Sequence, residues 1–134
     1  MKCIILAAGY ATRLYPLTEN FPKPLLEVNH KTILDYLIED MDSSGLIDEY
    51  IVISNHKFIN IFNNWAKNHT CNITVLDDGT ETNETRLGAV KDIKYAIDTL
   101  NINDDCLVIA GDNLLDFSLT TFIDYAKNKK QHVL

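Results

Sequence analysis

Residues 1–13, MKCIILAAGYATR, carry the pattern that decides the fold. The run from Lys2 to Ala7 is apolar without alternation, and it breaks at Gly9 into a stretch of small, turn and charged residues. A strand of this kind is buried on both faces, as in a parallel sheet between two layers of helices. The segment therefore predicts an α/β protein whose first strand lies inside the sheet.

The rest of the chain alternates between strand-like and helix-like patterns. Continuous apolar runs predict three further strands, and apolar residues at helical spacing predict four helices. The expected strands cover residues 49–54, 71–76 and 105–110, and the expected helices run from Thr32 to a stop at Gly45 and over residues 57–68, 87–100 and 118–129. This alternation indicates a doubly wound, Rossmann-like, mostly parallel sheet.

Connection rules then predict where a ligand binds. Right-handed crossovers place the strands in the order 3-2-1-4, so that the loops after strands 1 and 4 flank the point where the strand order reverses. Open α/β sheets bind ligands at this point, outside the carboxyl ends of their strands. The two loops carry Gly9 to Arg13 and Gly111-Asp112-Asn113.

Composition narrows the class of function. The chain has 134 residues, of which 46% are hydrophobic and 23% charged, as in one globular domain. Because no apolar run is long enough to span a membrane and no signal peptide precedes the first strand, we expect a cytoplasmic protein. A net charge of −7 argues against a general nucleic-acid or membrane binder. Residues 1–31 are locally cationic, which suggests a small anionic ligand there.

Cysteine and histidine do not predict a metal site. The three cysteines lack CxxC spacing and lie in or beside apolar runs, so we expect buried free thiols. The four histidines are scattered and form no HxxxH pair.

Two cationic segments favour phosphate binding. In the first, small residues around Gly9 lead to Arg13, so that backbone N–H groups and a guanidinium could hold phosphate oxygens. Taken alone, this pattern fits an ordinary loop equally well. In the second, Lys23 lies between Pro22 and Pro24, which stiffen the backbone and reduce the entropy lost when the ammonium group meets an anion.

Together, the run LAAGYATRLYPLT over residues 6–18 and FPKPLL over residues 21–26 closely resemble the signature of the sugar-phosphate nucleotidyltransferases, also called nucleoside-diphosphate-sugar pyrophosphorylases. That signature reads LAAGxGTRLxPLT followed by PKPLL, and the resemblance continues to Gly111-Asp112. One departure is Ala11, which stands where the family usually has its second glycine. A methyl group is tolerable there if the residue keeps φ below zero.

The resemblance implies an activity and a set of residues. Such enzymes join a nucleoside triphosphate to a sugar 1-phosphate and release pyrophosphate, so Arg13 would hold the β- and γ-phosphates, Lys23 the α-phosphate and the incoming phosphate, and Asp112 a Mg²⁺ ion. Asp77 and Asp78 are further candidates for base recognition. The nucleotide-binding set that follows from the resemblance is Leu6, Ala7, Ala8, Gly9, Ala11, Thr12, Arg13, Asn83, Thr85 and Gly88.

The resemblance also implies that residues 1–134 form the nucleotide-binding part of a single α/β domain whose sugar-binding half is absent. Truncation would leave the edge of the fourth strand unpaired, so we expect self-association through that edge. Two other functions stay open: a cytidylyltransferase acting on a non-sugar phosphate such as phosphocholine, and a non-catalytic nucleotide-binding module. A Rossmann dehydrogenase is disfavoured because the first loop lacks GxGxxG.

Overall fold

Four parallel strands form the central sheet of the computed structural model, which describes residues 1–111. The strands lie in the order β5-β4-β1-β6, which confirms the predicted order 3-2-1-4. In the register of the sheet, Lys2 lies opposite Glu49 on one side and Cys106 on the other. The bounds are Lys2–Leu6 for β1, Glu49–Ser54 for β4, Ile73–Asp77 for β5 and Cys106–Ala110 for β6.

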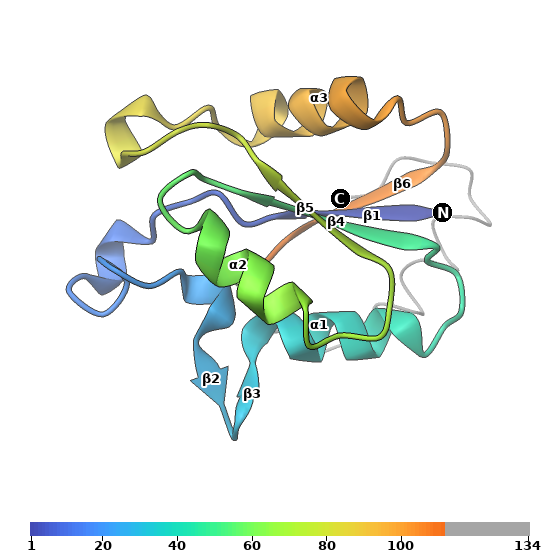
Figure 1. Cartoon of the computed structure of the whole chain (residues 1–134), viewed down its shortest axis with the longest axis horizontal. Coiled ribbons are helices and arrows are strands. Elements are labelled where there is room, and N and C mark those ends of the chain that lie inside the picture. Colours follow the sequence, from blue (N-terminus) through green and yellow to red (C-terminus); the bar gives the residue numbers. More distant parts are fainter. Residues whose placement is uncertain (112–134) are drawn as a thin grey trace.

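Helices cover both faces of this sheet, with α3 (Ala89–Leu100) on one side and α1 (Ile33–Asp42) and α2 (Ile59–Ala66) on the other (Figure 1). A capping box starts α1, because the Thr32 side chain accepts from the N–H of Asp35 and the Asp35 carboxylate accepts from the N–H of Thr32. The helix predicted over residues 118–129 lies outside the described residues.

The sheet separates two hydrophobic cores, as the unbroken apolar strands require. In β1, Ile4 packs toward α3 with Ile51 and Ala96, whereas Ile5 packs toward α1 and α2 with Phe62. All five side chains are 0% exposed. Burial on both faces is therefore confirmed.

The cysteines follow the prediction only in part. All three are free thiols, but Cys3 alone is buried, while Cys71 and Cys106 are half-buried. The difference arises because Cys3 lies in β1, one of the two inner strands, whereas Cys71 precedes β5 and Cys106 begins β6 at the two edges of the sheet.

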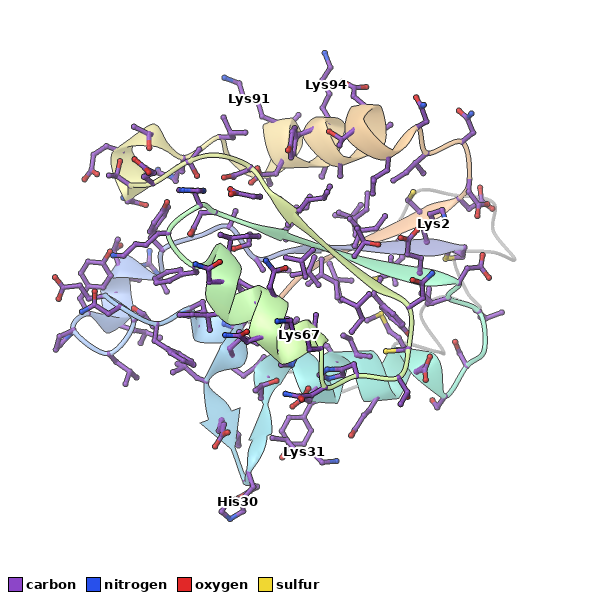
Figure 2. All side chains as sticks on the ribbon, viewed as in Figure 1. Lys2, His30, Lys31, Lys67, Lys91 and Lys94 are labelled. Carbon is purple, nitrogen blue, oxygen red and sulfur yellow. The ribbon has the colours of Figure 1, made fainter. Side chains whose placement is uncertain are left out.

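The buried face of helix α3 coincides only in part with its predicted apolar face. The helical pattern runs through Leu87, Val90, Ile93, Ile97 and Leu100. Of these, Ile93 and Leu100 pack against the core, but Val90 is 80% exposed, and the buried residues of the helix are Asp92 and Ala96. Lys91 and Lys94 point away from the sheet (Figure 2). Large isoleucines already fill this side of the sheet, so the small Ala96 fits against them where a larger side chain would not.

Several short elements interrupt the segments expected to be loops. The 3₁₀ turns are η1 (Thr12–Leu14), η2 (Lys23–Leu25) and η3 (Asn83–Thr85), and a small antiparallel hairpin joins β2 (Glu27–Val28) to β3 (Lys31–Thr32). His30 lies at the tip of that hairpin (Figure 2). Within residues 1–111, no helix has both the length and the apolar character needed to cross a membrane.

Candidate functional site

A cleft of about 280 Å³ opens at the carboxyl ends of β1 and β6, beside the start of α3. This is the position at which the strand order reverses, as the sequence predicts. Seven of the residues predicted to bind the nucleotide or its phosphates line the cleft: Leu6, Ala7, Ala8, Gly9, Ala11, Lys23 and Gly88.

In the segment at the end of β1 and in the loop after it, three carbonyl groups accept hydrogen bonds from other parts of the chain. The carbonyl of Leu6 accepts from the N–H of Gly111 at 2.9 Å, and that of Ala8 accepts from the side-chain amide of Asn55 at 3.0 Å. The carbonyl of Ala11 accepts from the Thr18 hydroxyl at 2.7 Å. Within residues 1–111, no acceptor meets the backbone N–H groups of residues 8–11. Such a row of N–H groups can bind phosphate oxygens.

Asn55 and Thr18 are buried polar residues that hold the loop in place. Asn55 is completely buried, and its side chain also accepts from the N–H of Phe58, so its orientation is fixed from both ends. Thr18 is 1% exposed. Thr18 belongs to the motif over residues 6–18, whereas Asn55 reaches the loop from the end of β4, where no local pattern marks it.

Ala11 does not meet the condition of a φ below zero, under which a methyl group would be tolerable here. Its backbone has φ 48° and ψ 49°, in the left-handed region that favours glycine. The conformation is imposed by the bonds to its carbonyl from Thr18 and from the N–H of Leu14, which begins the 3₁₀ turn η1. The methyl group is therefore held in a strained conformation at the wall of the cleft.

Lys23 enters the cleft from the second cationic segment. It begins η2, where Pro22 caps the turn and Pro24 is buried, and its own side chain is half-buried. The predicted stiffening by two prolines thus coincides with a lysine that lines the cleft.

The other wall of the cleft is the start of α3. Gly88 precedes the helix with φ 85°, a value that side-chain-bearing residues rarely adopt. This conformation turns the chain into the helix, and the helix N-terminus adds a partial positive charge beside the cleft.

Four predicted residues lie near the cleft but do not line it. Arg13 and Thr12 are exposed on η1, and Asn83 and Thr85 belong to η3, which is closed by its own capping box with Thr82. The predicted metal ligand, Asp112, lies outside the described residues. Within residues 1–111, no group of three or more His, Cys, Asp or Glu side chains could hold a metal ion.

Asp77, a candidate for base recognition, is engaged elsewhere. Its carboxylate binds Nδ1 of His56 at 2.6 Å and the N–H of Gly79 at 2.8 Å. The hydrogen bond to Asp77 raises the pKa of His56. This pair therefore stabilises the ends of β4 and β5 and does not line the cleft.

The cleft also contains two charged residues that the sequence analysis missed. Arg86 lines the wall before Gly88, and one of its N–H groups donates to the carbonyl of Asn83 at 2.6 Å. Asp92 lies one turn into α3 and is only 5% exposed. The sequence contains one indication of this position. Asp92 lies at helical spacing from Gly88 and Ala96, and it is the charged residue on that buried face.

Burial changes the chemistry of Asp92. Desolvation, reinforced by the neighbouring carboxyl of Asp78, raises the pKa of Asp92 from 3.8 to about 7. The carboxyl of Asp92 is therefore protonated more readily than an exposed aspartate.

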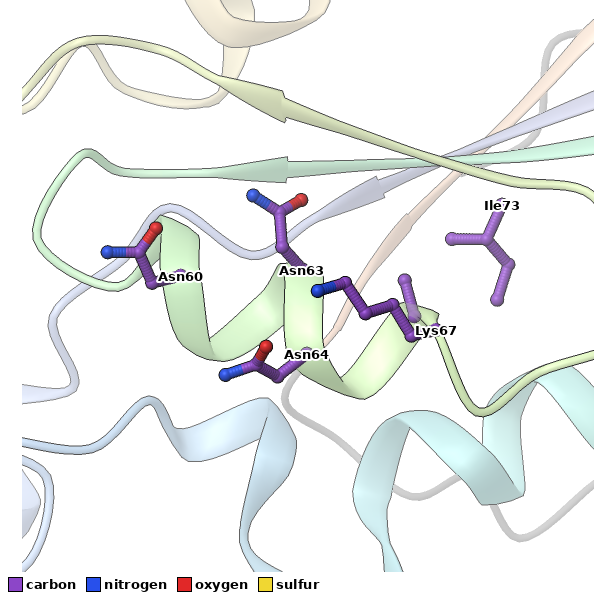
Figure 3. Close-up of a pocket in the computed structure, with 6 residues that line it drawn as sticks. Asn60, Asn63, Asn64, Lys67 and Ile73 are labelled. Atoms are coloured by element: carbon purple, nitrogen blue, oxygen red, sulfur yellow. The ribbon is translucent and has the colours of Figure 1, made fainter.

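A larger hollow of about 610 Å³ lies on α2, away from these groups. Its labelled side chains are Asn60, Asn63 and Asn64 of the helix, Lys67 just after it and Ile73 at the start of β5 (Figure 3). It contains none of the predicted site residues, and the smaller cleft is therefore the candidate site.

Comparison with known protein families places nearly the whole chain in one family. The family described as nucleotidyl transferase matches residues 2–134, almost the whole chain. The match includes the loop after β1, Lys23 and the start of α3.

Two curated relatives illustrate the range of nucleotidyltransferases that the chain resembles. The chain is 35% identical over 125 residues to the bifunctional protein GlmU of Methanocaldococcus jannaschii, an alignment that covers 93% of this chain and 28% of that protein. It is 51% identical over 53 residues to the choline-phosphate cytidylyltransferase of Streptococcus pneumoniae, covering 40% of this chain and 23% of that protein. The chain spans less than a third of the length of these relatives.

The fold matches solved structures as well. A Bacillus anthracis protein, provisionally named glucose-1-phosphate thymidylyltransferase, superposes with a TM-score of 0.80 over 97% of this chain and 51% of its own. At 22% identity this likeness concerns the fold, and it confirms the predicted nucleotide-diphospho-sugar transferase type.

Proposed function

Because the chain belongs to the nucleotidyl transferase family, we propose that it binds a nucleoside triphosphate in the cleft and joins its nucleoside monophosphate to a sugar 1-phosphate. The observation that carries the proposal is that the N–H groups of residues 8–11 have no acceptor within residues 1–111, and that Ala8, Gly9 and Ala11 line the cleft together with Lys23. This combination suits a polyphosphate, since it supplies several donors and a positive charge.

The proposed reaction is an in-line displacement at phosphorus. An oxygen of the sugar phosphate forms a bond to the α-phosphorus, and the bond from that phosphorus to the bridging oxygen breaks, so that pyrophosphate leaves with the electron pair. No protein nucleophile is needed, and the chain contributes positioning and charge neutralisation. Residues 8–11 would hold the phosphates, Lys23 would neutralise charge around the α-phosphate, and Arg13, exposed on η1, would reach the leaving pyrophosphate.

A Mg²⁺ ion fits the donors expected at this edge. Magnesium usually takes one or two carboxylates together with phosphate oxygens, and Asp112 directly follows Gly111, whose N–H is bonded to Leu6 beside the cleft. When bound, the ion would neutralise phosphate charge. Gly111 is required here because a Cβ atom would come within 2.9 Å of Ile5.

The test is calorimetric titration of the chain with nucleoside triphosphates in the presence of Mg²⁺. We expect one triphosphate to bind, and Lys23→Ala to weaken that binding by about tenfold or more, as for loss of a charge-assisted contact. Lys91→Ala is the matched control. This substitution removes the same charge, but Lys91 points away from the sheet (Figure 2). Absence of binding by every triphosphate would contradict the proposal.

A second acceptor class deserves the same assay. The 51% identity over 53 residues to a choline-phosphate cytidylyltransferase favours a non-sugar phosphate such as phosphocholine. Release of pyrophosphate from each bound triphosphate, with sugar 1-phosphates and phosphocholine as alternative acceptors, separates the two. Binding without release in any combination would instead support a non-catalytic nucleotide-binding module.

A further inference from the structure

The cleft contains one guanidinium group that the proposed function does not use. The chain has two arginines, Arg13 and Arg86, and of these Arg86 lines the cleft. Its neighbours in the lining are Gly88 and Ala89 at the start of α3, so it lies on the wall that α3 forms. Lys23 lines the same cleft from η2, and the cleft therefore has cations from two separate segments.

The guanidinium of Arg86 is held by the turn beside it. One of its N–H groups donates to the carbonyl of Asn83 at 2.6 Å, and the backbone N–H of Arg86 donates to the same oxygen at 3.4 Å. Asn83 belongs to η3, which the capping box between Thr82 and Thr85 closes. Within residues 1–111, no other group accepts from this guanidinium and no carboxylate forms an ion pair with it. Its remaining N–H groups are therefore available to a ligand.

The charges on the walls of the cleft favour an anion. Asp92 is the acid among the described lining residues, and burial together with Asp78 raises its pKa to about 7. At neutral pH its carboxyl therefore offsets only part of the positive charge of Lys23 and Arg86. Because the cleft has a volume of only about 280 Å³, these cations act on a bound anion at short range, where salt screens them little.

The chemistry of a guanidinium favours phosphate as that anion. Its planar fork of N–H groups matches the oxygens of a phosphate and can form two parallel hydrogen bonds, which the point charge of a lysine cannot. The bond to Asn83 fixes the fork before the ligand arrives, so less side-chain entropy is lost on binding.

We propose that Arg86 is a phosphate-binding residue, which holds the triphosphate from the α3 wall of the cleft. Lys23 and the N–H groups of residues 8–11 hold the same polyanion from the other segments. This inference rests on the proposed function and adds to it a residue that binds the phosphates of the substrate.

The experiment uses a probe that has neither base nor ribose. Calorimetry of the chain measures the binding of inorganic tripolyphosphate with Mg²⁺ and, separately, that of the tightest-binding nucleoside triphosphate. We expect Arg86→Ala to weaken the binding of both ligands by about tenfold or more, as for loss of a charge-assisted contact. Arg86→Lys should have an affinity between those of Arg86→Ala and wild type, because an ammonium group keeps the charge but not the fork.

Two control variants separate this role from other effects of the substitution. Lys94→Ala removes a positive charge from α3, but Lys94 points away from the sheet (Figure 2), so both affinities should keep their wild-type values. Thr82→Ala removes the hydroxyl that closes η3 and leaves Arg86 in place, so its effect should be much smaller than that of Arg86→Ala.

Three results would overturn the inference. If Arg86→Ala binds tripolyphosphate as tightly as wild type, Arg86 does not bind phosphate, and the proposed function still stands where Lys23→Ala weakens triphosphate binding. If only the nucleoside triphosphate binds more weakly, Arg86 contacts the nucleoside instead. If Thr82→Ala weakens binding as much as Arg86→Ala, Arg86 acts only through the fold of η3. Should wild type bind neither ligand, the inference and the proposed function both fail. Should Arg86→Ala not fold, Arg86→Lys decides, since it must weaken tripolyphosphate binding.

Discussion

Ala11 shows how a single residue can carry strain beside a candidate site. Its left-handed backbone costs an alanine about 1 kcal/mol more than a glycine, and the bonded Thr18 keeps it there. We expect Ala11→Gly to raise the free energy of unfolding by up to about 1 kcal/mol, reduced by the greater chain entropy of glycine in the unfolded state. Urea unfolding measures the change.

The control for this substitution is Ala66→Gly. Ala66 ends α2 in ordinary helical geometry, so glycine should lower the free energy of unfolding there by about 0.5–1 kcal/mol. A loss of stability in Ala11→Gly as large as in Ala66→Gly would show that the positive φ carries no strain.

Asp92 makes stability depend on pH in an unusual direction. Its pKa rises from 3.8 to about 7 on folding, because of burial and of Asp78, so the folded chain binds more protons than the unfolded chain between these values. The free energy of unfolding therefore falls as pH rises from about 4 to about 7. Asp92→Asn removes this titration, and we expect it to be more stable than wild type at pH 8 by about 1–3 kcal/mol.

Thermal melts at pH 5 and pH 8 test this expectation. The two proteins should differ much less at pH 5, where Asp92 is already protonated. Asp98→Asn should follow wild type at both values, since Asp98 is exposed. If the difference in stability between Asp92→Asn and wild type is the same at both pH values, Asp92 does not lose a proton between them.

A site residue could be predicted from the sequence when its role depends on residues close to it in the chain. Gly9 and Lys23 belong to a short motif whose spacing is visible in the sequence, and both line the cleft. Asn55 and Asp92 act through residues far away in the chain, so only the folded sheet brings them to the site. The backbone of Ala11 likewise depends on Thr18, seven residues later.

At the scale of elements, Asp35 connects the two helices on one face of the sheet. Besides capping α1, its carboxylate accepts from the indole of Trp65 at 2.9 Å and contacts Nε2 of His69 at 2.7 Å, at the end of α2. Burial raises the pKa of Asp35, but these hydrogen bonds and those from Thr32 outweigh it, so the pKa is lowered. The stabilisation is present above the ordinary pKa and is lost as pH falls below it.

Asp35→Ala should therefore lower the free energy of unfolding by about 2–3 kcal/mol at pH 7, because it removes a helix cap and leaves the Trp65 indole without an acceptor. Glu39→Ala is the control on the same helix. Glu39 makes an exposed ion pair with Lys31, and its loss should change stability by less than about 0.5 kcal/mol. Equal effects of the two substitutions would show that Asp35 does not link the helices.

The sequence predicts the existence and bounds of elements with long, unbroken apolar patterns. It predicts less well which face of such an element packs against the sheet. The strand over residues 49–54 has the predicted bounds because a run of apolar residues has no competing interpretation. The predicted helix is present over residues 89–100. Its buried face depends on the space that the isoleucines of the sheet leave, and the sequence of the helix alone does not show how large that space is. The 3₁₀ turns are too short to generate a period.

Across the whole molecule, binding a polyanion requires local charge to outweigh the net charge. The chain carries −7, which repels a triphosphate at long range. At the cleft, Lys23, Arg86 and the N–H groups of residues 8–11 act within contact distance, where solvent screens them least. The sheet order is what gathers these groups, because it brings segments near both ends of the described chain to one edge.

Because the cleft is lined by segments from several parts of the chain, we predict that a bound triphosphate stabilises the entire fold. The lining comes from the loop after β1, from η2, from the start of α3 and from Ala110 at the end of β6, so the unfolded chain cannot form the cleft. A ligand present at 100 times its dissociation constant then adds about 2.7 kcal/mol to the free energy of unfolding. Circular dichroism melts with the tightest-binding triphosphate and Mg²⁺ should show a rise of several degrees in Tm. Lys23→Ala should need more ligand for the same rise, and an equal rise with inorganic tripolyphosphate would mean that the nucleoside contributes nothing.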